Sequence, residues 1–138
     1  MAVSAILALA AFLASLDPKL SREIKNQFKP NERETSSSTS GPVMATDSEV
    51  TVVKVKTREG IFIEIYRNEN GNFALIKRLE MGVKDAYFNF NGQASNLALD
   101  DIDGDKTKEI LVPLYDENLV AHLTVLKYDS SSKEFIRL

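Results

Sequence analysis

The sequence predicts an all-β fold, built as a small antiparallel module of about seven or eight short strands. Two observations predict the strands: apolar and polar residues alternate with a period of two from about residue 49 onward, and turns rich in Gly, Asn and Asp separate the alternating segments. A third observation sets the preceding chain apart, since residues 1–28 have helical patterns and residues 29–48 have no apolar pattern. We therefore expect a hydrophobic and then amphipathic helix over 1–28, a flexible linker over 29–48 and the all-β module over 49–138.

The composition excludes several kinds of site and partner. The 138 residues contain no cysteine and one histidine, His122, so a disulfide framework, a thiolate nucleophile and a multi-histidine metal centre cannot form within one chain. A formal net charge of −3 lacks the clustered excess of Lys and Arg that a phosphate backbone selects, and we expect no nucleic-acid partner. The length is that of about one domain.

Residues 1–16 are uncharged and rich in Ala and Leu, which predicts a helix. The segment is shorter than the roughly 20 residues that span a bilayer, but it fits the apolar core of a signal peptide or a short anchor. The basic residues follow this segment, whereas a simple exported topology would have them ahead of it. A helix buried against the domain is the alternative.

Residues 16–28 predict an amphipathic helix. Leu16, Leu20, Ile24 and Phe28 recur four apart on an otherwise charged segment, which gives a narrow apolar stripe. Such a helix either lies on a membrane surface or continues the first helix.

Residues 29–48 contain two prolines and a Ser/Thr run, and they hold almost no apolar residues. A segment this polar cannot bury enough surface to order itself, which predicts a flexible linker. The folded unit should therefore begin near Glu49.

The strands follow in chain order, with a turn sequence such as Asn70-Gly71 or Asn91-Gly92 between neighbours. Lys54, Lys56 and Arg58 alternate with Val and Thr, and we interpret them as the polar face of the first strand and its turn. The expected strands are 50–57, 60–67, 72–80, 86–91, 95–100, 109–115, 119–128 and 134–138.

The segment from Asp100 to Glu109 is the part of the sequence that indicates specific chemistry. Asp101, Asp103 and Asp105 stand at alternate positions, and Glu109 follows four residues later. Oxygen ligands at this spacing suit a hard cation that takes six to eight of them, such as Ca²⁺. Magnesium fits less well because it demands near-octahedral geometry.

The run DIDGDKTKEILVP resembles the calcium-loop signature of FG-GAP/VCBS-type repeats, the repeats of integrin-like β-propellers. The resemblance implies a blade-like sheet in which the loop joins two strands and holds calcium. The family usually has Gly where this chain has Lys106, so we expect either a strained backbone angle there or a slightly reshaped loop, and metal binding that is weakened rather than lost. The metal ligands that the resemblance implies are the side chains of Asp101, Asp103, Asp105 and Glu109 and the main-chain carbonyl of Thr107.

One repeat makes about one blade, whereas propellers close with four to eight, so a closed monomeric propeller is not expected. Two forms of the module remain open. It is either a small sandwich that is stable alone, or an open sheet whose edges are covered by another copy or another protein.

Other interpretations of the acidic loop compete with calcium. The loop could be a solvated Asx-rich turn. An apolar strand followed by D-x-D-G also begins haloacid dehalogenase-like phosphatases, but these require Thr at the position of Asp105 and a doubly wound domain. His122 lies inside an expected strand without a spacing that predicts a catalytic triad, so it is interpreted as a packed or edge residue.

The sequence thus predicts a non-catalytic, calcium-binding module for binding or assembly, exported or membrane-anchored, with possible attachment to a membrane through residues 1–28. We do not expect an enzyme. The alternative is an accessory subunit or a weak hydrolase acting on an anionic or glycan ligand, with Asp100 or Glu109 as the acid or base. A site of modest affinity, about 10⁻⁴–10⁻³ M, suits an extracytoplasmic protein.

Overall fold

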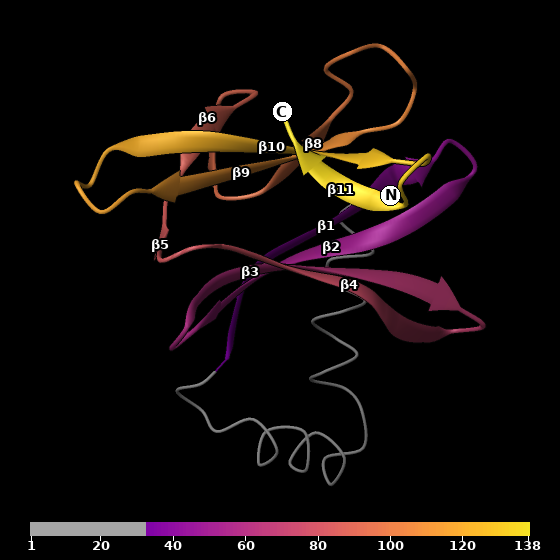
Figure 1. The fold of residues 1–138 in the computed structure, drawn as a ribbon, viewed down its shortest axis with the longest axis horizontal. Coiled ribbons are helices and arrows are strands. Elements are labelled where there is room, and N and C mark those ends of the chain that lie inside the picture. The colour runs from indigo at the N-terminus through magenta and orange to yellow at the C-terminus, as the bar shows by residue number, and fades with distance from the viewer. Residues whose placement is uncertain (1–32) are drawn as a thin grey trace, which may run out of the picture.

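A computed structural model describes residues 33–138, and every helix or strand in this range is a β-strand (Figure 1). The all-β prediction is therefore confirmed for this part of the chain, while the helices expected over 1–28 lie outside it. No helix in the described range is long and apolar enough to cross a membrane. The strands are β1 (Glu34–Ala45), β2 (Ser48–Thr57), β3 (Gly60–Glu69), β4 (Asn72–Gly82), β5 (Lys84–Asp85), β6 (Phe88–Phe90), β7 (Gln93–Ser95), β8 (Ala98–Asp100), β9 (Glu109–Tyr115), β10 (Ala121–Asp129) and β11 (Glu134–Arg137).

The strands form two antiparallel sheets that lie one over the other, as Figure 1 shows, and a small β6–β7 hairpin. The first sheet is a four-stranded meander in the order β1-β2-β3-β4. The second sheet has the order β11-β10-β9-β5, and β8 pairs with β9 as well. Short turns between consecutive strands account for the meander, since antiparallel neighbours need only a tight connection.

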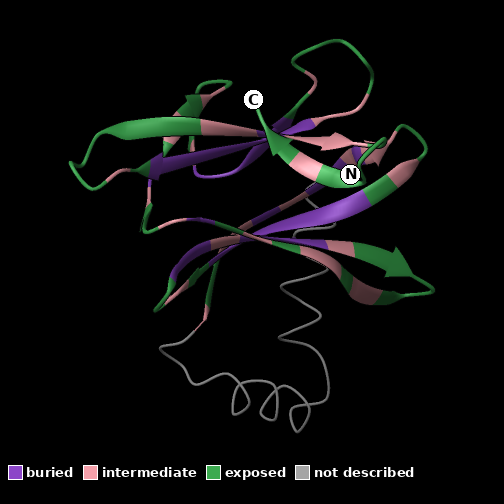
Figure 2. Cartoon of the chain, in the orientation of Figure 1, coloured by how far each residue is buried: buried purple, intermediate pink, exposed green. Residues whose placement is uncertain are grey.

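The hydrophobic core lies between the two sheets. Ile61, Ile63 and Ile65 alternate along β3 and are fully buried, and they belong to one cluster with Ile110 and Val112 of β9. Figure 2 shows this buried layer in purple along β2, β3 and β9. Because successive residues of a strand point to opposite faces, this alternation fixes which face of β3 meets the second sheet.

The prediction of a flexible linker over 29–48 is wrong from residue 34 onward, because β1 occupies Glu34–Ala45. The folded unit therefore includes residues that precede Glu49. The Ser and Thr residues of β1 need no apolar pattern to order, since the backbone of β1 pairs with β2 over Glu34–Gly41 and again at Ala45. Val43 adds an apolar anchor that is 2% exposed.

The number of strands after residue 48 is larger than predicted. The expected strands 86–91 and 95–100 are present in shorter form as β6 and β8, and β5 and β7 are two further short strands that were not predicted. The remaining expected strands agree with β2, β3, β4, β9, β10 and β11 to within a few residues. The Asn91-Gly92 turn has positive φ at both residues, 51° and 82°, as a tight hairpin turn requires.

The interpretation of Lys54 as part of a polar face is also wrong, because its side chain is fully buried between the sheets. Its Nζ lies 2.6 Å from Oδ1 of Asp85 and donates hydrogen bonds to the carbonyl oxygens of Pro113 at 2.7 Å and Asn96 at 2.8 Å. Burial lowers the pKa of Lys54, while the hydrogen bond and charge of Asp85 act against that shift. Lys54 therefore joins the first sheet to the second by its charge and its hydrogen bonds.

Candidate metal centre

The acidic loop connects β8 to β9, and these two strands determine where it starts and ends. Asp100 pairs with Glu109 in the antiparallel register, so the intervening residues form a closed loop at the end of a two-stranded ladder. As expected from the sequence, Asp100 lies in a strand. The amide of Lys108 donates a 2.8 Å hydrogen bond to the carbonyl of Pro42 in β1, which attaches the loop to the edge of the first sheet.

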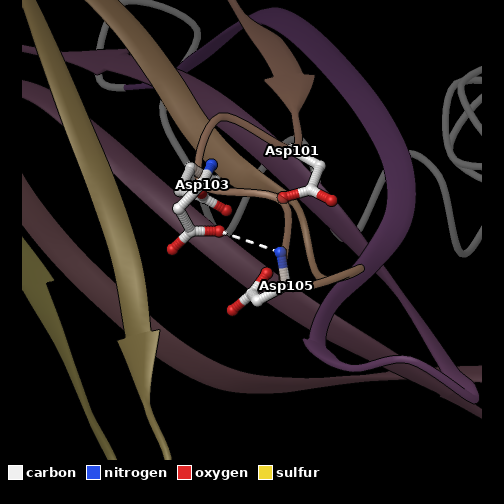
Figure 3. Close-up of side chains that lie close together, drawn as sticks. Asp101, Asp103 and Asp105 are labelled. Carbon is white, nitrogen blue, oxygen red and sulfur yellow. Dashed lines mark hydrogen bonds between the residues drawn. The ribbon is translucent and has the colours of Figure 1, made fainter.

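The structure brings four of the five predicted site residues together. One carboxylate oxygen from each of Asp101, Asp103, Asp105 and Glu109 lies within 4.8 Å of the others. Figure 3 shows the three aspartates on the same loop, with the amide of Asp105 donating to the carboxylate of Asp103. This cluster of four acidic residues could hold a metal ion.

Hydrogen bonds from the loop's own backbone orient the three aspartates. Asp101 accepts from the amides of Gly104 at 2.8 Å and Lys106 at 2.9 Å. Asp105 Oδ1 accepts from the amide and the hydroxyl of Thr107, at 2.9 Å and 2.8 Å. These are Asx-type contacts, which also occur in loops without a metal.

Lys106 has a φ of 72°, in the left-handed region that favours glycine. This confirms the strained angle expected at the position where the FG-GAP/VCBS-type signature usually has Gly. The cost for a non-glycine residue is about 1–2 kcal/mol. The loop therefore adopts a turn at this position although the residue is unfavourable for it.

Glu109 differs from the three aspartates because its side chain is fully buried. Its Oε1 accepts from the amides of Ile102 at 3.2 Å and Asp103 at 3.3 Å, whereas Oε2 has no hydrogen-bond partner within residues 33–138. Burial raises the pKa of Glu109 and the nearby aspartates raise it further, against the effect of the hydrogen bond from Ile102. A buried carboxylate oxygen without a partner is costly, and a cation beside it would remove that cost.

Lys127 contributes a positive charge to the cluster and was not predicted as part of the site. Its Nζ contacts Oδ2 of Asp103 and lies 2.8 Å from Oδ2 of Asp105. Leu126 of β10 pairs with Ile110 of β9, so the next residue along β10 comes beside the start of β9 and the acidic loop. The only sequence signal for this contact is the lysine at position 127. That signal can be recognised only when the pairing of β9 with β10 is already known.

His122 is exposed on β10, and its Nε2 lies 2.7 Å from Oδ2 of Asp116. Oδ1 of Asp116 also accepts from the amides of Asn118 at 2.8 Å and Val120 at 3.0 Å. These contacts, led by the hydrogen bond from Val120, lower the pKa of Asp116. The carboxylate thus organises the turn between β9 and β10. An open hollow of about 750 Å³ lies beside this turn and is lined by His122, Asp116 and Glu117 among others.

No protein-family model matches this chain, and comparisons with curated proteins and with solved structures also give no match. The similarity of the loop to FG-GAP/VCBS-type repeats therefore stays a prediction from the residues that carry it.

Proposed function

We propose that this protein is a non-catalytic calcium-binding module for binding or assembly, in which the metal stabilises the 100–109 loop. The observation that carries the proposal is the cluster of four carboxylates within 4.8 Å of one another, one of which is fully buried and has an oxygen without a hydrogen-bond partner in the described range. The carboxylates of Asp101, Asp103 and Asp105 lie at the more exposed side of the cluster, and Glu109 lies at its base.

Calcium fits this cluster better than other common cations. All the available ligands are oxygens, which favours a hard cation over zinc or copper. An exposed loop can adjust to the 6–8 ligands that calcium takes, whereas magnesium demands a near-ideal octahedron and keeps its waters. In this proposal the carbonyl of Thr107 adds a fifth protein ligand, in line with the repeat signature that the loop resembles.

The predicted affinity of about 10⁻⁴–10⁻³ M is typical of extracellular calcium modules. The ammonium of Lys127 and the strained angle at Lys106 both act to weaken binding relative to a site with four unopposed carboxylates. An affinity in this range supports a location outside the cytoplasm, in a periplasmic, secreted or membrane-anchored protein.

An assembly role fits the sheet edges of the module. Within residues 33–138, the outer edge of β4 (Asn72–Gly82) is not paired to another strand, and all of its residues except Met81 are exposed or half-buried. An edge of this length presents main-chain donors and acceptors to another chain. The partner proposed here is therefore another protein or another copy of this chain.

Thermal unfolding of the full chain tests the calcium proposal. In about 10 mM calcium, a dissociation constant of 10⁻⁴–10⁻³ M adds about 1.4–2.7 kcal/mol to the free energy of unfolding, which raises the midpoint by several degrees. The same concentration of magnesium should give a smaller shift, and excess chelator should abolish it.

A pair of matched variants locates the effect. Asp103→Asn removes a ligand charge from the loop, while Glu117→Gln removes an acid from an exposed turn outside the cluster. We expect the calcium shift to be lost in the first variant and kept in the second. An unchanged midpoint in calcium, or an equal shift in Asp103→Asn, would contradict the proposal.

A further inference from the structure

The strand β2 is buried on both faces, which is unusual for a strand of a two-layer antiparallel sandwich. All six residues from Val50 to Val55 are buried. Val50 and Val52 belong to the core between the sheets, while Val53 and Val55 form a separate cluster. Antiparallel sheets of this kind commonly have one face in the core and the other in solvent.

We use "outward face" for the side of the first sheet that points away from the second sheet. Val53 and Val55 are 1% and 0% exposed there, and Tyr66 and Phe73 pack against them. Within residues 33–138, all the other strands lie on the opposite side of this sheet (Figure 1). The described strands therefore do not account for the burial of the outward face.

A buried ion pair lies at the centre of the outward face. The side chain of Glu64 is 3% exposed, and both of its oxygens accept hydrogen bonds from Arg33, at 2.6 Å and 2.8 Å. The Tyr66 hydroxyl donates to the same carboxylate at 2.6 Å, and the Arg78 Nε lies 3.5 Å away. Arg33, Tyr66 and Arg78 surround this carboxylate, so side chains of the described chain account for its burial.

Arg33 places the start of the described chain on this face. Five residue steps separate residue 28 from Arg33, so residue 28 must lie within about 18 Å of Arg33 even when the connecting chain is fully extended. Residues 16–28 would form a helix about 20 Å long, and four strands about 4.8 Å apart give a sheet of about the same width. A short tether of this kind gives the segment a high effective concentration at the face.

The sequence of this segment suits a sheet surface. Leu16, Leu20, Ile24 and Phe28 form one narrow apolar stripe, and the other positions are mostly charged or polar. A helix lying on a sheet needs one apolar stripe toward the sheet and a polar face toward water. The apolar part of the outward face, with its two buried valines, offers the complementary surface.

We propose that the outward face of the β1–β4 sheet is the docking site for residues 16–28 of the same chain, with the Leu16/Leu20/Ile24/Phe28 stripe packed over Val53 and Val55. The segment is then a third layer of the domain, and residues 1–15 extend from its far end. The proposal does not depend on calcium.

Thiol labelling of the full chain tests this docking, because the natural sequence has no cysteine. Val53→Cys places one thiol on the outward face, and Leu123→Cys places a control thiol on β10, where the side chain is 47% exposed. We expect the first thiol to react at least about 100-fold more slowly, since it reacts only when the segment opens. Equal rates for the two thiols would overturn the proposal.

Substitutions in residues 16–28 show whether this segment, a second copy of the chain or a membrane covers the outward face. Leu20→Asp with Ile24→Asp should raise the labelling rate of the Val53→Cys thiol toward the control rate, whereas Asn26→Asp, on the opposite side of the predicted helix, should not. Protection that requires a dimer, seen as a rate that rises on dilution, would assign the face to a second copy. Protection that appears only with phospholipid vesicles would assign it to a membrane. Either result would overturn the proposal.

If Val53→Cys does not fold, tryptic cleavage of the unmodified chain gives an independent measurement. Docking predicts slow cleavage after Arg22 and Lys25, relative to cleavage after Lys133 in the exposed turn before β11. The Leu20→Asp and Ile24→Asp substitutions should accelerate cleavage at the two sites in the segment. Cleavage in the segment as fast as at Lys133 would count against docking.

Discussion

The protein has two buried glutamates in its described part, and they differ in how their charge is balanced. Glu64 on the outward face is bonded to Arg33 and Tyr66, with Arg78 nearby, so both of its oxygens have partners. Glu109 at the acidic loop accepts two main-chain hydrogen bonds through one oxygen, and its other oxygen has no hydrogen-bond partner in the described range. Its neighbouring carboxylates add negative charge.

The difference shows which of the two carboxylate charges is compensated by other residues of the protein. Burial would raise the pKa of Glu64, but the hydrogen bonds and charges of its partners outweigh burial and lower it. At Glu109 burial and the like charges act together and raise the pKa. Glu64 therefore belongs to a structural ion pair with Arg33. The charge of Glu109 is only partly compensated, so an added cation could bind beside it. Substitutions at Arg33, Glu109, Lys127 and Tyr66 test this contrast.

Arg33→Met should give the largest loss of stability. The substitution leaves the carboxylate of Glu64 buried without its bidentate partner, which costs about 3 kcal/mol of unfolding free energy. Urea denaturation of the full chain measures the change, which should be the same with and without calcium. Arg67→Met is the matched control, because its pair with Glu69 is 3.5 Å long and both side chains are about half exposed, and it should cost less than about 1 kcal/mol. Similar losses of unfolding free energy in the two variants would show that the Arg33–Glu64 pair contributes no more than the exposed Arg67–Glu69 pair.

Glu109→Gln should abolish the calcium-dependent stabilisation of about 1.4–2.7 kcal/mol in about 10 mM calcium. The amide keeps an oxygen that can accept the hydrogen bonds from Ile102 and Asp103, so the calcium-free protein should still fold. Thermal unfolding with calcium and with chelator measures both quantities. A Glu109→Gln variant that keeps the wild-type calcium shift would show that the buried carboxylate is not a ligand.

Lys127→Met should tighten calcium binding by several-fold, an effect of less than about 1.4 kcal/mol, since that energy corresponds to a tenfold change. The ammonium contacts two of the aspartates, so a divalent cation must compete with it for their oxygens. Isothermal titration calorimetry of the full chain measures the dissociation constant. Lys77→Met removes a lysine that pairs with Glu134 instead, and it should leave the affinity unchanged. Weaker binding in Lys127→Met would show that the lysine supports the site.

Tyr66 should have no effect on the pH dependence of stability near neutral pH and a measurable one only in alkali. Burial, together with the hydrogen bond to Glu64, raises the pKa of Tyr66 from 10.0 to about 12. The unfolded chain therefore loses the phenolic proton first, so the stability contribution is fully present below about pH 10 and is lost as the pH rises toward 12. Denaturation at several alkaline pH values measures this loss, and Tyr66→Phe should remove it. An equally steep alkaline loss in Tyr66→Phe would contradict the assignment.

Local patterns predicted much of the second sheet and the acidic loop. The strand β9 agrees with its predicted bounds because its apolar run lies between an acidic turn and a second turn. The four acidic residues come together because they are close in sequence and the loop closes on itself. Spacing in the sequence is sufficient to predict which groups come together when all of them lie within about ten residues of one another.

Contacts between distant residues could not be predicted in this way. The alternation in β2 indicates two faces, but it does not say that Lys54 points into the core and Val53 away from it. The Arg33–Glu64 pair joins residues 31 apart, and the contacts of Lys127 with the acidic loop span 22 and 24 residues. The composition of β1 also carried no signal, because a strand that is ordered mainly by pairing its backbone needs few apolar side chains.

The hydrogen bond between Lys108 and Pro42 has a mechanical consequence. It fastens the end of the acidic loop to β1, and the other end of β1 is where the chain passes to residues 1–32. Tension applied through the N-terminus would load the β1–β2 hydrogen bonds over Glu34–Gly41 first, and it would reach the loop through Pro42 at the far end of that ladder. A cation that stiffened the loop would reinforce the attachment at the far end of that strand. The force needed to pull β1 away would then depend on the calcium concentration.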